Sequence, residues 1–110
     1  SGYSSGSTLA GQVAFEHAEL FAGLLVLPGR PFWSNDNRDD LIAGAAWKLN
    51  VAWRPHTSDE YYPIASLRAD RRAMLDAGYP LVWGEIAGTH VYTPDDLNYL
   101  FGKIGSWVAP

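Results

Sequence analysis

The chain has 110 residues, 47% of them hydrophobic and 18% charged, which suits one small folded domain and argues against a disordered chain. The net charge of -4, without a basic run, makes nucleic acid an unfavourable partner. The absence of cysteine excludes disulfides and thiolate metal sites, and no apolar run approaches the roughly 20 residues that a membrane-spanning helix needs.

The first residues form the pattern G-x-S-x-G at 2–6, which is typical of the sharp strand-to-helix turn that exposes a nucleophilic serine above an α/β sheet. Its spacing makes Ser4, rather than Ser5, the candidate nucleophile. We expect glycine at both ends of the pattern because the backbone there leaves no room for a side chain. Only Ser1 precedes the pattern, so we expect the preceding strand, and others before it, to be missing from this chain.

Helices and strands alternate in the first half of the chain. Apolar residues at helical spacing predict a helix over Thr8–Glu19. Phe21–Leu27 then has the length and composition of a buried strand, closed by Pro28 and Gly29. A loop is expected over Arg30–Asn37 and a second helix over Asp39–Trp47.

The second half repeats this alternation. Leu49–Trp53 is expected to be a buried strand and His56–Pro63 a polar loop. Ile64–Ala77 is expected to be a helix that stops at Gly78, a residue type favoured just past a helix end. A third strand is predicted over Leu81–Ile86, followed by a loop over 87–92.

The last helix has the clearest start signals. Thr93 suits the N-cap, Pro94 the first helical position, and the acidic Asp95 and Asp96 the positive helix end. One apolar stripe is predicted along it, formed by Leu97, Leu100, Phe101, Ile104 and Val108.

Three strands that are each followed by a helix predict an α/β fold with parallel strands and helices covering the sheet. A three-stranded parallel sheet with every strand buried is a poor free-standing domain, and its first strand needs a neighbour. This is a second reason to expect strands upstream.

Three loops lie where a parallel sheet places the C-terminal ends of its strands, the edge at which functional residues gather, and they offer Ser4, Asp59 and His90. A serine hydroxyl is a weak nucleophile, so it needs a base to accept its proton and a third group to orient that base. The chain order Ser, Asp, His is the order of the α/β-hydrolases. We therefore predict Ser4 as nucleophile, Asp59 as acid and His90 as base.

Other acids remain open from the sequence. Asp36 follows the first predicted strand, whereas Asp39 and Asp40 better suit the start of a helix. Glu60 could replace Asp59 but lies in an aromatic run and is the weaker candidate.

Two other histidines compete with His90 as the base. His56 lies near Asp59 and would require an acid from elsewhere, so it ranks second. His17 lies on a predicted helix away from the functional edge and is expected to be a surface residue.

A hydrolase also needs N–H donors that stabilise the developing oxyanion. The backbone N–H of Ser5 can be one of them. The other should come from a loop after an earlier strand, so we expect the chain alone to be inactive or nearly so. No cofactor is predicted, because the three histidines lack metal-ligand spacing and no glycine-rich phosphate loop opens a helix.

The chain is rich in aromatic residues, with five Trp and six Tyr. Most are expected to pack in the core or at its rim. Trp33, Tyr61 and Tyr62 are the candidates for contacts with the substrate.

Most of the chain resembles, in register, the C-terminal half of the α/β-hydrolase superfamily. It is most similar to the branch of polyhydroxyalkanoate depolymerase-like and feruloyl esterase-like proteins. The segments that carry the resemblance are residues 2–6, Glu19–Gly23, His56–Asp59, Asp76–Tyr79 and Ala87–His90.

The resemblance implies that residues 1–110 are the C-terminal portion of an α/β-hydrolase domain acting on carboxylic esters. It also implies Ser4, Asp59 and His90 as nucleophile, acid and base. The chain departs from the family at Ser7 and at His56, where the family often has glycine. The polar ring of His56 would lie beside the active edge.

The leading hypothesis is a serine carboxylesterase that forms an acyl-enzyme and is one piece of a larger or two-chain enzyme. Its partners would be an ester substrate and a complementary N-terminal chain or segment. The alternative is a non-catalytic, hydrolase-like module for binding or assembly, with Trp and Tyr side chains forming its interaction surface. A third hypothesis, an N-terminal nucleophile at Ser1, has no accessory pattern to support it.

Overall fold

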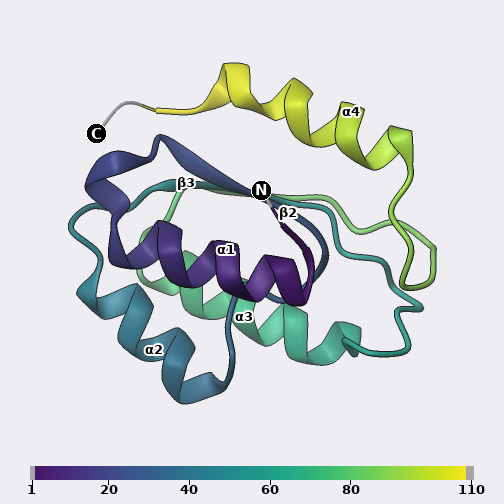
Figure 1. The fold of residues 1–110 in the computed structure, drawn as a ribbon, viewed down its shortest axis with the longest axis horizontal. Coiled ribbons are helices and arrows are strands. Elements are labelled where there is room, and N and C mark those ends of the chain that lie inside the picture. Colours follow the sequence, from purple (N-terminus) through teal and green to yellow (C-terminus); the bar gives the residue numbers. More distant parts are fainter. Residues whose placement is uncertain (1, 109–110) are drawn as a thin grey trace.

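The computed structural model describes residues 2–108 as a parallel sheet between two layers of helices (Figure 1). Ser1 lies outside the described residues. The elements in chain order are β1 (Gly2–Ser4), α1 (Ser5–Glu16), the 3-10 helix η1 (Ala18–Leu20), β2 (Gly23–Gly29), α2 (Asn35–Gly44), β3 (Asn50–Trp53), α3 (Ile64–Asp76), β4 (Leu81–Trp83), α4 (Pro94–Lys103) and the 3-10 helix η2 (Ile104–Ser106).

The four strands lie in the order β1-β2-β3-β4, and each pairs with the next in parallel. The predicted α/β class with a parallel sheet is therefore confirmed. The prediction of only three strands is wrong, because Gly2–Ser4 pairs with β2, with Gly2 opposite Val26 and Ser4 opposite Gly29. The neighbour that β2 was expected to need is thus β1, inside the chain.

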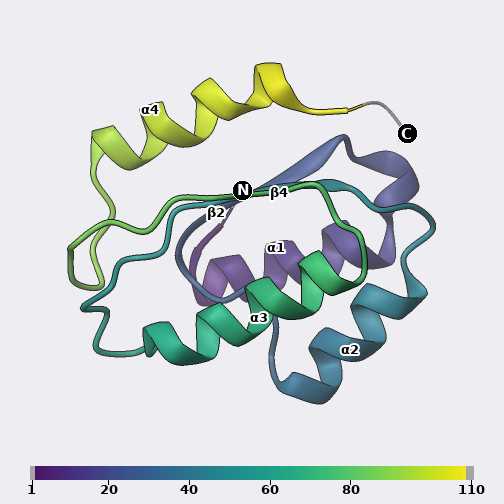
Figure 2. The same cartoon turned by 180° about the vertical axis from the view of Figure 1, so that it is seen from behind.

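Helices α1, α2 and α3 lie on one face of the sheet and α4 lies on the other (Figures 1 and 2). Strand β2 shows why both faces are covered. Its Leu24 and Val26 belong to the larger core cluster, while Leu25 and Leu27 pack in a smaller cluster with Leu100 of α4. Successive side chains of a strand point to opposite faces, so an unbroken apolar run requires helices on both sides.

In the N-terminal half, the boundaries of α1, β2 and α2 differ from the prediction. Helix α1 begins directly after Ser4 instead of at Thr8. Helix α2 begins at Asn35 instead of Asp39, because the Ser34 hydroxyl caps it by accepting a hydrogen bond from the Asn37 N–H (3.0 Å). Strand β2 is shifted to Gly23–Gly29 and includes the Pro-Gly pair that was expected to close it.

The C-terminal half follows the prediction more closely. Helix α3 ends one residue earlier than expected, and Gly78 adopts a positive φ of 85° just after it. The third predicted strand is shorter, since β4 ends at Trp83 and only an isolated bridge joins Ile86 to His56.

The capped start of α4 is confirmed, but its apolar stripe is only half buried. Leu97 and Leu100 pack against the sheet, whereas Phe101, Ile104 and Val108 are exposed. The chain tightens into the 3-10 turn η2, which changes the helical period and brings Trp107 against the sheet instead.

None of the helices within residues 2–108 has the length and apolar character needed to cross a membrane.

Candidate active site

Ser4 lies at the turn from β1 into α1 and is the one non-glycine residue with a positive φ in the described part of the chain (φ 57°, ψ -128°). Gly2 permits this turn, because a Cβ there would lie 2.5 Å from the Ser7 Cα. The sequence also predicted that Gly6 leaves no room for a side chain, and this prediction is wrong. Apart from its chain neighbours and the backbone of its own helix, a Cβ on Gly6 would meet no atom of residues 2–108 within 4 Å. The tight packing of the turn therefore depends on the first glycine of the pattern.

The structure brings Ser4, His90 and Asp59 together in one hydrogen-bonded line. His90 Nδ1 lies 2.8 Å from Asp59 Oδ2, and His90 Nε2 lies 2.8 Å from Ser4 Oγ. Because a carboxylate only accepts, Nδ1 carries the proton and Nε2 accepts from the Ser4 hydroxyl. This is the arrangement in which a histidine can take the serine proton.

The Asp59 carboxylate is itself held in place. The Asp59 side chain is 1% exposed, and its Oδ1 accepts hydrogen bonds from the backbone N–H groups of Tyr61 (2.9 Å) and Tyr62 (3.0 Å). The loop after β3 therefore fixes the carboxylate that faces His90.

The competing acids and bases lie elsewhere. Asp36, Asp39 and Asp40 are exposed on α2, and Glu60 is exposed beside Asp59. Among the competing histidines, His56 bonds to Thr89 and Asp96 instead of Ser4, and His17 is on the surface as expected. Asp36 lies in the first turn of α2, so the expectation that Asp39 and Asp40 start this helix is wrong.

Three tyrosine rings surround the His90 imidazole. Tyr3 stacks on it at 5.2 Å between ring centroids, Tyr61 meets it edge-on at 4.9 Å, and Tyr62 lies tilted at 5.4 Å. The Tyr3 hydroxyl also donates to the His90 carbonyl (2.7 Å). Burial, followed by the negative charge of Asp59, raises the pKa of Tyr3 above its ordinary value of 10.0, so this donor keeps its proton at neutral pH.

Sequence reasoning did not single out Tyr3. It occupies a variable position of the G-x-S-x-G pattern, and only the fold shows that it reaches a residue 87 positions later.

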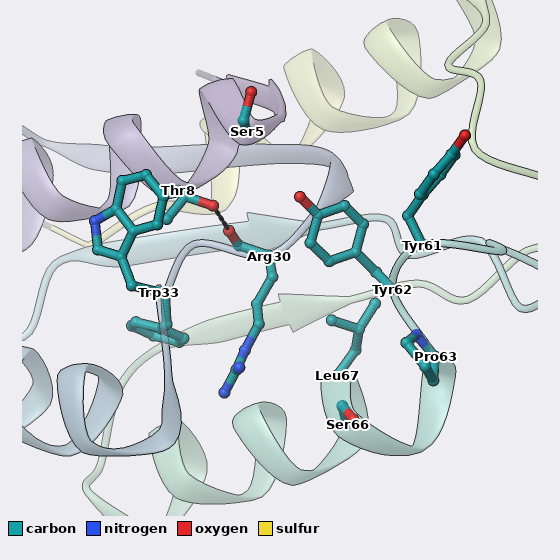
Figure 3. Close-up of a pocket in the computed structure, with 10 residues that line it drawn as sticks. Ser5, Thr8, Arg30, Trp33, Tyr61, Tyr62, Pro63, Ser66 and Leu67 are labelled. Carbon is teal, nitrogen blue, oxygen red and sulfur yellow. Dashed lines mark hydrogen bonds between the residues drawn. The ribbon is translucent and has the colours of Figure 1, made fainter.

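A cavity of about 310 Å³ opens beside Ser5 and contains all three predicted substrate contacts, Trp33, Tyr61 and Tyr62, in its lining (Figure 3). Figure 3 shows Trp33 and Tyr62 on opposite sides, with the Arg30 side chain between them extending away from Ser5. The Arg30 guanidinium bonds to Asp70 at 2.7 and 2.8 Å, so its charge is already paired. The cavity thus presents aromatic walls next to the start of α1.

Ser5 is the first residue of α1. The first N–H groups of a helix have no partner within the helix and carry its positive partial charge, so they suit a developing oxyanion. Within residues 2–108 no group of three or more His, Asp or Glu side chains could hold a metal ion.

A parallel sheet between helices, with a serine at the first strand-to-helix turn, defines a hydrolase-like α/β fold. The solved structure of esterase PE8 has the same fold, with a TM-score of 0.72 at 16% sequence identity. The match covers 97% of this chain and 48% of that chain, so the chain spans about half the length of the esterase. Neither family models nor the sequences of curated proteins match this chain.

Proposed function

We propose that residues 1–110 are the C-terminal portion of an α/β-hydrolase domain and carry the site of a serine carboxylesterase. The observation that carries this proposal is the unbroken line from Ser4 Oγ through His90 to Asp59, with both hydrogen bonds at 2.8 Å. The likeness of the fold to an esterase supports it.

The geometry supports a two-step reaction. His90 Nε2 accepts the Ser4 proton as Oγ attacks the ester carbonyl, and Asp59 stabilises the imidazolium that forms. His90 then returns the proton to the leaving alcohol, which leaves an acyl group on Ser4. Water, deprotonated by His90, attacks the acyl-enzyme, releases the acid and restores the serine.

The Ser5 N–H is one donor to the oxyanion in this proposal. It follows the nucleophile directly and borders the cavity. One part of the ester would lie in that cavity, against Trp33, Tyr61 and Tyr62. Because the cavity walls are aromatic and Arg30 is paired, it suits an uncharged group.

We infer that a complementary N-terminal segment or chain supplies the second oxyanion donor. Two observations support it: the chain spans about half of the solved esterase, and an apolar groove lies open on the outer side of α1. Leu9, Val13 and Phe21 line this groove and are 60%, 41% and 41% exposed. Without that segment, the 110 residues lack the second oxyanion donor and should hydrolyse esters slowly.

The test is labelling with a fluorophosphonate probe, followed by mass spectrometry, on this chain and on the natural polypeptide that contains it. We expect an adduct on Ser4, loss of it in Ser4→Ala, and retention in Ser5→Ala, which keeps the backbone N–H. Ser4→Ala has no hydroxyl to attack the phosphonate, so no adduct can form at this position. No Ser4 adduct in either form would contradict the proposal.

The same experiment separates the alternative, a non-catalytic binding module. Trp33 and Tyr61 are 62% and 71% exposed, which also suits a surface for a binding partner. That alternative expects no Ser4 adduct, and it expects Ser4→Ala to leave the biological activity intact.

A further inference from the structure

The loop that carries His90 is joined to the loop that carries Asp59 by a short ladder of hydrogen bonds. We call residues 86–90 the base loop and residues 56–59 the acid loop. The Thr57 N–H donates to the Ile86 carbonyl (2.9 Å), and the Ser58 N–H donates to the Gly88 carbonyl (2.9 Å). The two loops therefore keep a fixed register beyond the ends of β3 and β4.

The His56 side chain adds the next connection. Its Nδ1 lies 2.7 Å from the Thr89 carbonyl oxygen, and its Nε2 lies 3.0 and 3.1 Å from the two oxygens of Asp96. Both side chains are buried, with His56 4% and Asp96 1% exposed. The base loop can close over the ring because residue 88 is glycine, where a Cβ would lie 2.7 Å from Nδ1.

Both ring nitrogens of His56 face acceptors. A carbonyl oxygen cannot donate, so Nδ1 must carry a proton. Asp96 is held as a carboxylate by the Thr93 N–H (2.8 Å) and by the Arg54 guanidinium, whose Nε lies 3.0 Å away. Nδ1 is therefore the donor to the Thr89 carbonyl, while Nε2 faces the Asp96 carboxylate.

The charged groups around His56 come from two elements. Arg54 precedes it on the segment after β3, and Asp95 and Asp96 lie in the first turn of α4; all three line the same cavity as His56. The Asp96 carboxylate thus lies between the Arg54 guanidinium and the His56 ring.

We propose that His56, held by Asp96, is a positioning residue for His90. Its bond to the Thr89 carbonyl fixes the planar peptide group that leads into His90. The Tyr3 hydroxyl fixes the following peptide group through the His90 carbonyl. With both planes held, the direction of the His90 side chain between Ser4 and Asp59 is set. This role rests on the proposed hydrolase function.

Two substitutions of His56 separate the hydrogen bond to Thr89 from the hydrogen bond to Asp96. The amide of His56→Asn stands near the place of Nδ1, so it can still donate to Thr89 but does not reach Asp96. The longer His56→Gln reaches Asp96 and leaves the Thr89 carbonyl without a donor. The readout is the rate constant for fluorophosphonate labelling of Ser4.

We expect His56→Asn to label within about threefold of the natural protein and His56→Gln to lose about tenfold or more, because small displacements of a catalytic group reduce rates steeply. A role limited to donating a hydrogen bond to Asp96 predicts the reverse order, which would overturn the proposal. The matched controls His17→Asn and His17→Gln change an exposed histidine outside the site and should leave the rate unchanged.

Nuclear magnetic resonance of ¹⁵N-labelled histidine rings tests the proposal without any labelling reaction. In the natural protein His56 Nδ1 should carry a proton, and a bare Nδ1 would overturn the proposal even if neither variant folds. The His90 Nδ1 proton should persist in His56→Asn and be lost by exchange in His56→Gln. Equal signals in the two variants would contradict positioning, whereas absent Ser4 labelling with the expected signals would contradict only the hydrolase function.

Discussion

Ser4 adopts a backbone conformation that costs a non-glycine residue about 1–3 kcal/mol, so the surrounding structure must hold it there. Ser4 pairs with Gly29 of β2, whose φ is 155°, and a Cβ on Gly29 would lie 2.8 Å from both the Ser4 N and O atoms. Gly2 allows the equally close approach of β1 to α1. The strained serine thus depends on two glycines, one in its own strand and one in the neighbouring strand.

Gly2→Ala should displace the turn and reduce Ser4 labelling by about a hundredfold, because a catalytic group displaced by about 1 Å can lose that much. Rates of probe labelling on folded protein, with circular dichroism as the check of folding, measure the effect. Gly6→Ala is the matched control, since its Cβ meets no described atom within 4 Å. Equal losses in both variants would contradict the account of the turn.

Among single residues, the sequence predicted Ser4, Asp59 and His90 as one group, because all three lie where parallel strands end and these ends share one edge of the sheet. It did not predict Tyr3 or the His56–Asp96 pair as neighbours of the base loop. Neither belongs to a spacing pattern, and their contacts join residues 87 and 40 positions apart.

Asp96 both caps helix α4 and holds the His56 side chain. The capping box of α4 pairs the Thr93 hydroxyl with the Asp96 N–H and the Asp96 carboxylate with the Thr93 N–H. The same carboxylate bonds to His56. The start of α4 is therefore built from the residues that hold the base loop.

Thr93→Ala should lower the free energy of unfolding by about 1 kcal/mol, the usual effect of losing an N-cap side chain. Urea unfolding followed by circular dichroism measures it. Thr89→Ala is the matched control, because that exposed threonine contributes its carbonyl, which the substitution keeps, to the His56 contact. A loss as large in Thr89→Ala would count against the cap as the cause.

The element boundaries that were missed have local causes acting within the folded chain. Helix α2 starts early at the Ser34 cap, and α1 starts directly after the strained Ser4, where apolar periodicity gives no signal. Ile104 and Val108 leave the α4 stripe because the chain tightens into a 3-10 turn at the end of the helix, whereas Phe101 is exposed within the helix itself. Periodicity finds a helix, but caps and packing decide its ends.

On the scale of the whole molecule, buried Asp70 of α3 joins three parts of one face. Its carboxylate bonds to Arg30, which follows β2, and to Arg38 of α2 (3.2 Å). Asp70 is fully buried, while both arginine side chains are about one-seventh exposed (15% and 13%). The buried Asp70 carboxylate and the two guanidinium groups therefore stabilise one another.

Asp70→Asn should lower the free energy of unfolding by about 3 kcal/mol, because it leaves the largely buried Arg30 guanidinium without a carboxylate and Arg38 with exposed Asp39 alone. Denaturant unfolding measures this. Asp39→Asn removes the other carboxylate near Arg38, but Asp39 is 61% exposed, so its effect should stay below about 1 kcal/mol. Similar losses at the two positions would contradict the importance of burial here.

Ionisation of Tyr79 lowers the stability of the fold at alkaline pH. The Tyr79 hydroxyl donates to the Ile42 carbonyl (2.9 Å), and burial raises its pKa above the ordinary 10.0. The unfolded chain then loses this proton first, so the contribution of Tyr79 to stability is complete below pH 10 and falls as pH rises through the higher pKa of the folded state. Tyr3 acts in the same direction.

Tyr79→Phe should lose about 1 kcal/mol near pH 8 through the missing hydrogen bond, and show a weaker decline of stability above pH 10. Urea titrations at pH 8 and at successive values above 10 measure both effects. Tyr61→Phe, at a residue 71% exposed, is the control and should keep the alkaline decline. An unchanged decline in Tyr79→Phe would contradict the assignment to this residue.

The sequence by itself determined the parallel α/β architecture, the serine at a strand-to-helix turn and the loops that carry Asp59 and His90. These follow from local patterns and from the rule that parallel strands share one functional edge. Only the tertiary structure decided between His90, which the sequence ranked first, and His56 as the base that faces Ser4, and showed that a fourth strand, Gly2–Ser4, ends at the serine. Such choices depend on register and loop packing between distant segments, which no local pattern encodes.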